Sequence, residues 1–111
     1  MLAGRRAFES GAHAEALFHF GAAIERSPDA AWAWHGRGDA LLGLGDAAAA
    51  LSAYDRAAAI APQTGLHQGG RALALRALGQ HDAEERAWEA ALSLDPSLDW
   101  LRSGRPPPRI S

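Results

Sequence analysis

The chain has 111 residues and a formal net charge of −2, which fits one domain and offers no basic excess for binding nucleic acid. It contains no cysteine, which excludes disulfides and thiolate metal sites, and no apolar run of about 18 residues that could span a membrane. Alanine and leucine dominate and valine is absent, so the composition favours an all-α protein.

The first two expected helices lie on either side of a glycine. They cover residues 2–10 and 13–26, and Gly11 separates them as a helix-terminating residue. Pro28 then prevents the second helix from continuing.

The next two helices are expected over residues 30–43 and 47–60. Asp29 and Asp46 stand where the side chain of an N-cap residue would accept a backbone hydrogen bond. Pro62 ends the second helix of this pair, as Pro28 ends the one before it.

A third pair of helices is expected over residues 65–77 and 82–94, with Asp82 and Glu85 spaced as a capping box. Glu84 and Glu85 are adjacent acidic residues, which is typical of a solvated helix face. Glycine weakens a helix by about 0.5–1 kcal/mol relative to alanine. We therefore expect the third pair to be looser, because its first helix contains Gly65, Gly69 and Gly70.

A last short helix is expected to start after Ser97 and to end before Pro106. The run of prolines that follows predicts a proline-rich tail over residues 104–111 that is either extended and polyproline-like or disordered. A short final helix covers little surface, so we expect three large side chains to be only partly buried: Trp88, Leu92 and Leu94.

The chain repeats itself with a step of 34 residues. Prolines, glycines, aromatic residues and alanines each recur at this step: Pro28, Pro62 and Pro96; Gly11, Gly45 and Gly79; Phe20, Tyr54 and Trp88; Ala23, Ala57 and Ala91. Small residues at Gly38 and Ala50 would let the two helices of a unit approach closely. Tyr54 would then pack toward the first helix of the next unit.

These residues resemble the tetratricopeptide repeat, and the middle unit matches best, with Trp34, Gly38, Leu41, Ala50, Tyr54, Ala57 and Pro62. The resemblance implies an all-α, right-handed solenoid of three helix-turn-helix repeats with a short C-terminal helix. The expected domain spans residues 1–103, with repeats at about 1–28, 29–62 and 63–96, a partial capping helix at 97–103 and a proline-rich tail at 104–111.

The resemblance also implies that the first helix of each unit lines a concave, partner-binding groove. The groove candidates in that register are apolar with interspersed charges of both signs: Arg5, Phe8, Trp32, His35, Asp39, Leu42, Leu66, Leu73 and Arg76. Some members of the family hold acidic peptide tails with a clamp of lysine, asparagine and arginine. This chain has neither lysine nor asparagine, so a clamp of that kind is not expected.

The sequence therefore favours a non-enzymatic protein-interaction module, since no catalytic motif, metal-ligand spacing or cofactor-binding motif is found. A permanent subunit or assembly factor of a larger complex is the alternative, because the repeat ends are short and apolar. Partners are expected to be proteins or peptides rather than nucleic acid, with a second copy of the chain also possible. The N-terminus lacks the apolar core of a signal peptide, which predicts a cytoplasmic location, and the Ala-, Gly- and Arg-rich composition hints at a bacterial source.

Overall fold

A computed structural model of the chain describes the backbone of residues 2–104 and the side chains of residues 11–104. The described part is built from helices and contains no strand, so the all-α prediction is confirmed. The helices are α1 (Leu2–Arg26), α2 (Ala31–Gly43), α3 (Ala47–Ile60), α4 (Gly65–Ala77), α5 (His81–Leu94) and α6 (Asp99–Ser103), with a 3₁₀ turn, η1 (Pro96–Leu98), before α6. The expected proline-rich tail lies outside the described residues.

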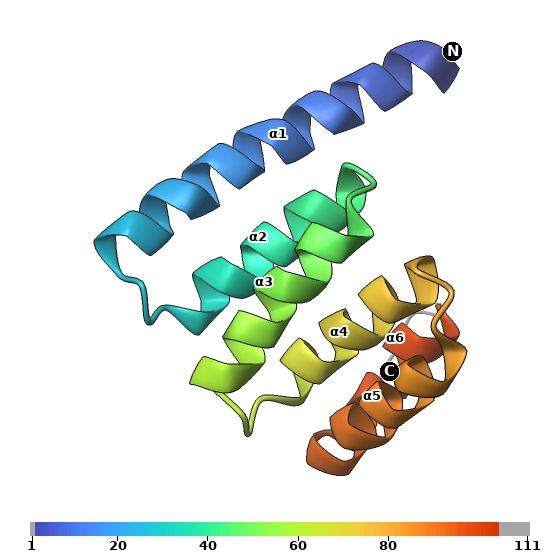
Figure 1. The fold of residues 1–111 in the computed structure, drawn as a ribbon. Coiled ribbons are helices and arrows are strands. Elements are labelled where there is room, and N and C mark those ends of the chain that lie inside the picture. Colours follow the sequence, from blue (N-terminus) through green and yellow to red (C-terminus); the bar gives the residue numbers. More distant parts are fainter. Residues whose placement is uncertain (1, 105–111) are drawn as a thin grey trace, which may run out of the picture.

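The helices stack in chain order from α1 to α5 (Figure 1), each packed against the next. The first helices of successive units are also in contact along the stack, because α4 contacts α2 on one side and α6 on the other. This arrangement agrees with helical hairpins stacked as repeats, and the short C-terminal helix is present as expected. The right-handed sense of the stack stays a prediction.

Two hairpin turns follow the glycine pattern. Gly45 and Gly79 have φ values of 88° and 76°, in the left-handed region that suits glycine. The next residue in each turn donates its N–H to a carbonyl in the last turn of the helix: Asp46 to Leu41 O and Gln80 to Leu75 O. These glycines therefore end α2 and α4 at the expected places.

The expected caps are only partly present. Asp46 caps α3, accepting a hydrogen bond of 3.1 Å from the Ala49 N–H, as predicted. The predicted cap at Asp29 is wrong, because α2 starts one residue later, with Ala30 as its N-cap and no side-chain bond. The capping box of Asp82 and Glu85 is also wrong, since α5 already begins at His81.

The two helices expected at residues 2–10 and 13–26 are one continuous helix, α1, of 25 residues. Gly11 does not have the positive φ of Gly45 and Gly79. In the register of the repeat, Ala12 stands where Asp46 caps α3. Alanine offers no cap and is the strongest helix former, so the backbone continues as a helix through the place where the turn was expected.

The core is organised around buried aromatic rings. Tyr54 is fully buried between two helices, because its ring lies against Gly38 of α2 on one side and Gly70 of α4 on the other. The prediction that Trp88 is partly covered is wrong, since only 1% of it is exposed and it packs with Leu98 of η1 and Leu101 of α6. Leu94 remains 45% exposed, as expected.

The three glycines of α4 each permit a close contact. A Cβ on Gly65 would lie 2.9 Å from the Ala91 carbonyl oxygen, one on Gly69 would lie 3.0 Å from Leu101, and one on Gly70 would lie 2.6 Å from the Tyr54 ring. All three positions are buried. The cost in helix propensity is therefore offset by packing, and the looser third unit stays a prediction that amide hydrogen exchange can test.

Replacing Gly70 tests this packing. The substitution Gly70→Ala should lower the free energy of unfolding by about 1–3 kcal/mol, because the new methyl group overlaps the Tyr54 ring. The control is Gly21→Ala in the interior of α1, where a Cβ meets only the end of Arg37 at 3.7 Å. There the free energy should rise, by up to about 1 kcal/mol. Urea unfolding followed by circular dichroism measures both, and equal effects would contradict the assigned role of Gly70.

Candidate functional site

The described groove candidates lie on α2 and α4. We call Trp32, His35, Asp39 and Leu42 of α2, with Leu66, Leu73 and Arg76 of α4, the α2–α4 face. Its most exposed members are Trp32 (64% exposed), Asp39 (61%), Arg76 (44%) and Leu66 (42%). Arg5 and Phe8 lie in α1, and their side chains fall outside the described residues.

Two other apolar members of this face belong partly to the core. Leu42 is half-buried against the cluster that contains Tyr54, and Leu73 is half-buried against the cluster that contains Trp88. Trp32 instead packs edge-on against Phe20 of α1, with ring centroids 6.3 Å apart, and leaves most of its surface exposed.

Arg76 is held by other parts of the protein. Its Nε donates to Glu84 Oε2 at 2.8 Å, a terminal nitrogen donates to the Arg102 carbonyl oxygen at 2.9 Å, and the guanidinium lies over the Trp88 ring. Arg76 thus ties α4 to α5 and α6, and these contacts occupy much of the group that was expected to face a ligand.

The expectation that Glu84 is solvated is wrong. Its side chain is only 13% exposed and accepts hydrogen bonds from Arg76 and from the Trp88 indole N–H at 2.9 Å. Burial acts to raise the pKa of Glu84, but the hydrogen bonds from Trp88 and Arg76 outweigh it and hold the pKa below its ordinary value. Glu84 therefore stays ionised where the other repeats have alanine.

A chain of polar side chains leads from the exposed Asp39 of this face into the interior. The Tyr54 hydroxyl donates to Asp39 Oδ1 at 2.6 Å, and Asp39 Oδ2 lies 3.6 Å from His35 Nε2. On the other side of its ring, His35 Nδ1 lies 3.0 Å from Nδ1 of His67. The chain Tyr54–Asp39–His35–His67 joins three helices, α2, α3 and α4.

Burial controls the ionisation of this polar chain. It lowers the pKa of His35, although Asp39 opposes the shift, and it lowers the pKa of His67, with His35 adding to the effect. Burial also raises the pKa of the Tyr54 hydroxyl, as do its hydrogen bond to Asp39 and the charge there. At neutral pH both imidazoles are therefore uncharged, so that one Nδ1 can donate to the other.

The pairing of His35 with His67 was not predicted from the sequence, where no histidines stand four residues apart on one helix. The two residues are 32 positions apart, two fewer than the repeat step. Leu101 approaches Gly69 from the next unit with the same spacing. A search for pairs separated by 32 residues would thus have found both contacts.

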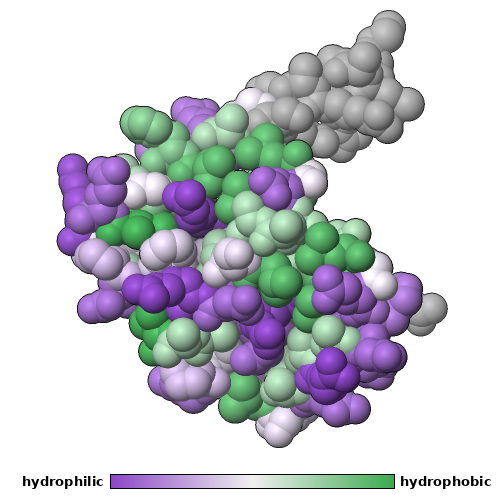
Figure 2. Space-filling model, viewed as in Figure 1, coloured by the Kyte–Doolittle hydropathy of each residue, from purple (hydrophilic) through white to green (hydrophobic). Residues whose placement is uncertain are grey.

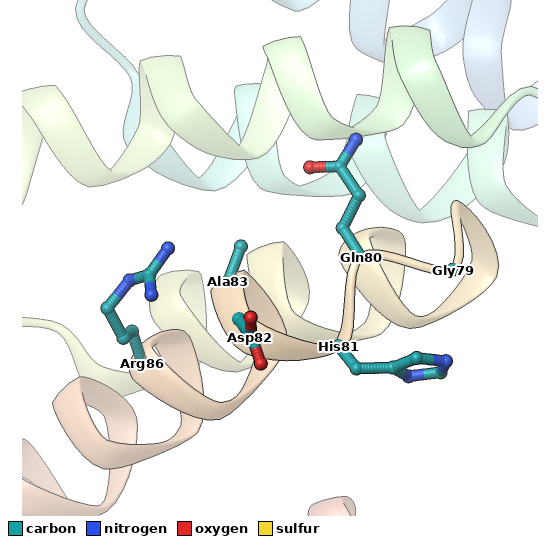
Figure 3. A pocket seen from close by; sticks show the side chains of 6 residues that line it. All are labelled: Gly79, Gln80, His81, Asp82, Ala83 and Arg86. Atoms are coloured by element: carbon teal, nitrogen blue, oxygen red, sulfur yellow. The ribbon is translucent and has the colours of Figure 1, made fainter.

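No group of three or more side chains that could hold a metal ion occurs in the part of the chain that the structure describes. A hollow of about 500 Å³ at the turn between α4 and α5 is lined by Gly79, Gln80, His81, Asp82, Ala83 and Arg86 (Figure 3). In that view His81 and Arg86 point in different directions, so their side chains do not converge on one point. The hollow includes no residue of the α2–α4 face.

The tetratricopeptide repeat model matches residues 7–78, which is more than half of the chain. The chain therefore belongs to the tetratricopeptide repeat family, whose repeats generally mediate protein–protein interaction and are typically not enzymes. A search of curated proteins found none that matches the sequence significantly. Among the described residues, no helix has the length and apolar character needed to cross a membrane.

Removing the Tyr54 hydroxyl tests the polar chain. The substitution Tyr54→Phe should keep the ring packing but lower the free energy of unfolding by about 0.5–1.5 kcal/mol, since a hydrogen bond is lost while the exposed Asp39 carboxylate can be hydrated by water instead. Urea unfolding gives this value. If the hydroxyl contributes only through Asp39, the same substitution in an Asp39→Ala background should have little further effect.

The histidine pair predicts a pH dependence. Because both pKa values are lower in the folded chain than the ordinary 6.5, the unfolded chain binds protons first as the pH falls. The free energy of unfolding should then be highest above pH 6.5 and decrease as the pH falls below it. Denaturant unfolding between about pH 7 and pH 5 measures the slope.

A matched pair of variants identifies the source of that slope. His67→Leu places leucine where Leu101 stands in the next unit, and the slope should become shallower. The control is His81→Gln at a side chain that is 82% exposed, where the wild-type slope should persist. An unchanged slope in His67→Leu would show that other groups cause the pH dependence.

Proposed function

We propose that the chain is a non-enzymatic interaction module that binds a peptide or protein segment on the α2–α4 face. The observation that carries the proposal is the exposure of two large apolar side chains, Trp32 and Leu66, at the same position of successive repeats. Exposed tryptophan is costly in water and is enriched at the energetic centre of protein interfaces. Binding of an apolar segment across both repeats accounts for this pair.

Asp39 gives the face a preference for charge. Its carboxylate is exposed between the two repeats while the Tyr54 hydroxyl fixes its orientation. Arg76, the other charged member of the described face, is already paired with Glu84. A bound segment that combines apolar side chains with an arginine, a lysine or a free amino group would therefore complement this surface.

The polar chain supports a structural rather than a catalytic role. Each of its histidines uses Nδ1 to contact the other, and the Tyr54 hydroxyl is committed to Asp39. These groups thus fix the positions of α2, α3 and α4 beneath the binding face. We extend the proposal to protein or peptide partners rather than nucleic acid, and to a cytoplasmic location.

Selection of peptides from a display library tests the proposed function. The double variant Trp32→Ala, Asp39→Arg should bind the selected peptides on the order of tenfold more weakly, or worse, because it removes the anchor and reverses the charge. Because Asp39→Arg also removes the acceptor of the Tyr54 hydroxyl, circular dichroism and urea unfolding should first show that the double variant is folded under the conditions of the binding assay. The control Ser52→Arg alters an exposed residue of α3 and should bind as the wild type does. Equal binding by the double variant, measured by calorimetry, would place the site elsewhere.

A permanent subunit of a larger complex is a second candidate. The exposed apolar side chains outside the α2–α4 face favour it, with Phe18 on α1 74% exposed and Leu94 and Trp100 at the other end of the stack 45% and 38% exposed. A stoichiometric partner that stays bound in high salt after affinity purification would support this role. Weak, exchangeable clients would support the peptide-binding module instead.

A further inference from the structure

The second helix of each repeat unit belongs to α1, α3 or α5. The positions that this helix uses for packing are less buried in α1 than in α3 and α5. In α3, four positions are at most 3% exposed: Ala50, Ala53, Tyr54 and Ala57. Three of the four counterparts in α5 are equally buried: Ala87, Trp88 and Ala91. The counterparts in α1 are half-buried or exposed: Ala16, His19, Phe20 and Ala23. Figure 2 shows hydrophobic surface gathered along the described part of α1.

The difference arises because, among the described residues, α1 packs against α2, whereas α3 packs against both α2 and α4. The Tyr54 ring lies between Gly38 and Gly70, the second of which belongs to the following unit. Phe20 makes the equivalent of the contact between Tyr54 and Gly70, because its ring lies against Gly36 of α2. The equivalent of the contact between Tyr54 and Gly38 would join Phe20 to residue 4. This residue lies in the same helix as Phe20 and cannot fold back onto it.

We propose that a second copy of the chain fills this place, so that residues 2–10 of each α1 cover the open face of the other α1. Such an exchange of an identical element forms a closed, two-fold symmetric dimer. The proposal goes beyond peptide binding on the α2–α4 face, because it uses a different helix and a different surface.

The repeat fixes the register of this dimer. Positions 38 and 54 meet in the hairpin of α2 and α3. One repeat step of 34 residues earlier, the equivalent positions are 4 and 20. Two antiparallel α1 helices that place residue 4 of one opposite residue 20 of the other have their two-fold axis near Ala12. Residue 20 of the first then lies opposite residue 4 of the second, so both open faces are covered at once.

The segment 2–10 has the composition that this place requires. Gly4 holds the position of Gly38, and Ala7 holds the position of Leu41, so a small residue and an apolar residue recur where the other unit has them. The dimer would thus continue an interface that the chain already forms between α2 and α3. Since Ala12 favours helix over turn, the exchange between copies replaces the hairpin that the first unit does not form.

Light scattering coupled to size exclusion tests the assembly. The wild-type chain should elute with twice the mass of the 11.7 kDa monomer at high protein concentration. Asparagine is a good, uncharged N-cap, so Ala12→Asn should allow the hairpin to close within one chain and weaken dimerisation on the order of tenfold or more. Ala14→Asn is the matched control on the exposed surface of α1, and it should remain dimeric.

A cross-link tests the register. The natural sequence has no cysteine, so Ala12→Cys introduces a single thiol near the expected two-fold axis. Mild oxidation should give a covalent dimer of this variant and not of the control Ser52→Cys on α3. A wild-type monomer, a dimer unaffected by Ala12→Asn, or equal cross-linking of both cysteine variants would each overturn the proposal. Phe18 is exposed but is not one of the four positions of the open face. Loss of the dimer in Phe18→Ser but not in Ala12→Asn would therefore place the interface elsewhere and also overturn the proposal.

Discussion

The packing of an aromatic ring against the bare backbone of a neighbouring helix is the contact on which the stack depends. Phe20, Tyr54 and Trp88 recur at one position of the repeat, and each ring extends toward a glycine of a helix in the following or the same unit. A Cβ on Gly38 or Gly70 would lie 2.6 Å from the Tyr54 ring, well inside van der Waals contact. The spacing between successive helices is therefore set by the thickness of a ring lying on a backbone without side chains.

The same constraint explains a composition that is otherwise unfavourable for helices. Glycine is a poor helix former, yet α2 and α4 each have three glycines, and five of these six are buried: Gly36, Gly38, Gly65, Gly69 and Gly70. Tertiary packing decides the stability of these helices, as it does for most helices in globular proteins. It also accounts for Glu84, whose carboxylate replaces a small alanine but is stabilised by Arg76 and the Trp88 indole.

The repeat period made most of the fold predictable. It gave the bounds of α3 and α4 to the residue, because proline, glycine and the N-cap Asp46 agree there. The prediction failed at Gly11. The period placed a turn there by analogy with Gly45 and Gly79, but Ala12 cannot cap a following helix and α1 continues through it. For the α2–α4 face, the spacing along one helix was enough to predict that Trp32 and Asp39 lie on an exposed side of α2. The pairing of His35 with His67 and of Arg76 with Glu84 depends on how neighbouring helices are offset, which the spacing within one helix does not contain.

The two junctions between successive first helices use the same positions with opposite chemistry. At these positions α2 meets α4 through the imidazoles of His35 and His67, whereas α4 meets α6 through Gly69 and a methyl group of Leu101. Hydrocarbon does not respond to acid, but two imidazolium ions 3.0 Å apart repel each other. Acid therefore weakens the contact between α2 and α4 at this position, whereas the contact between Gly69 and Leu101 carries no group that could take up a proton.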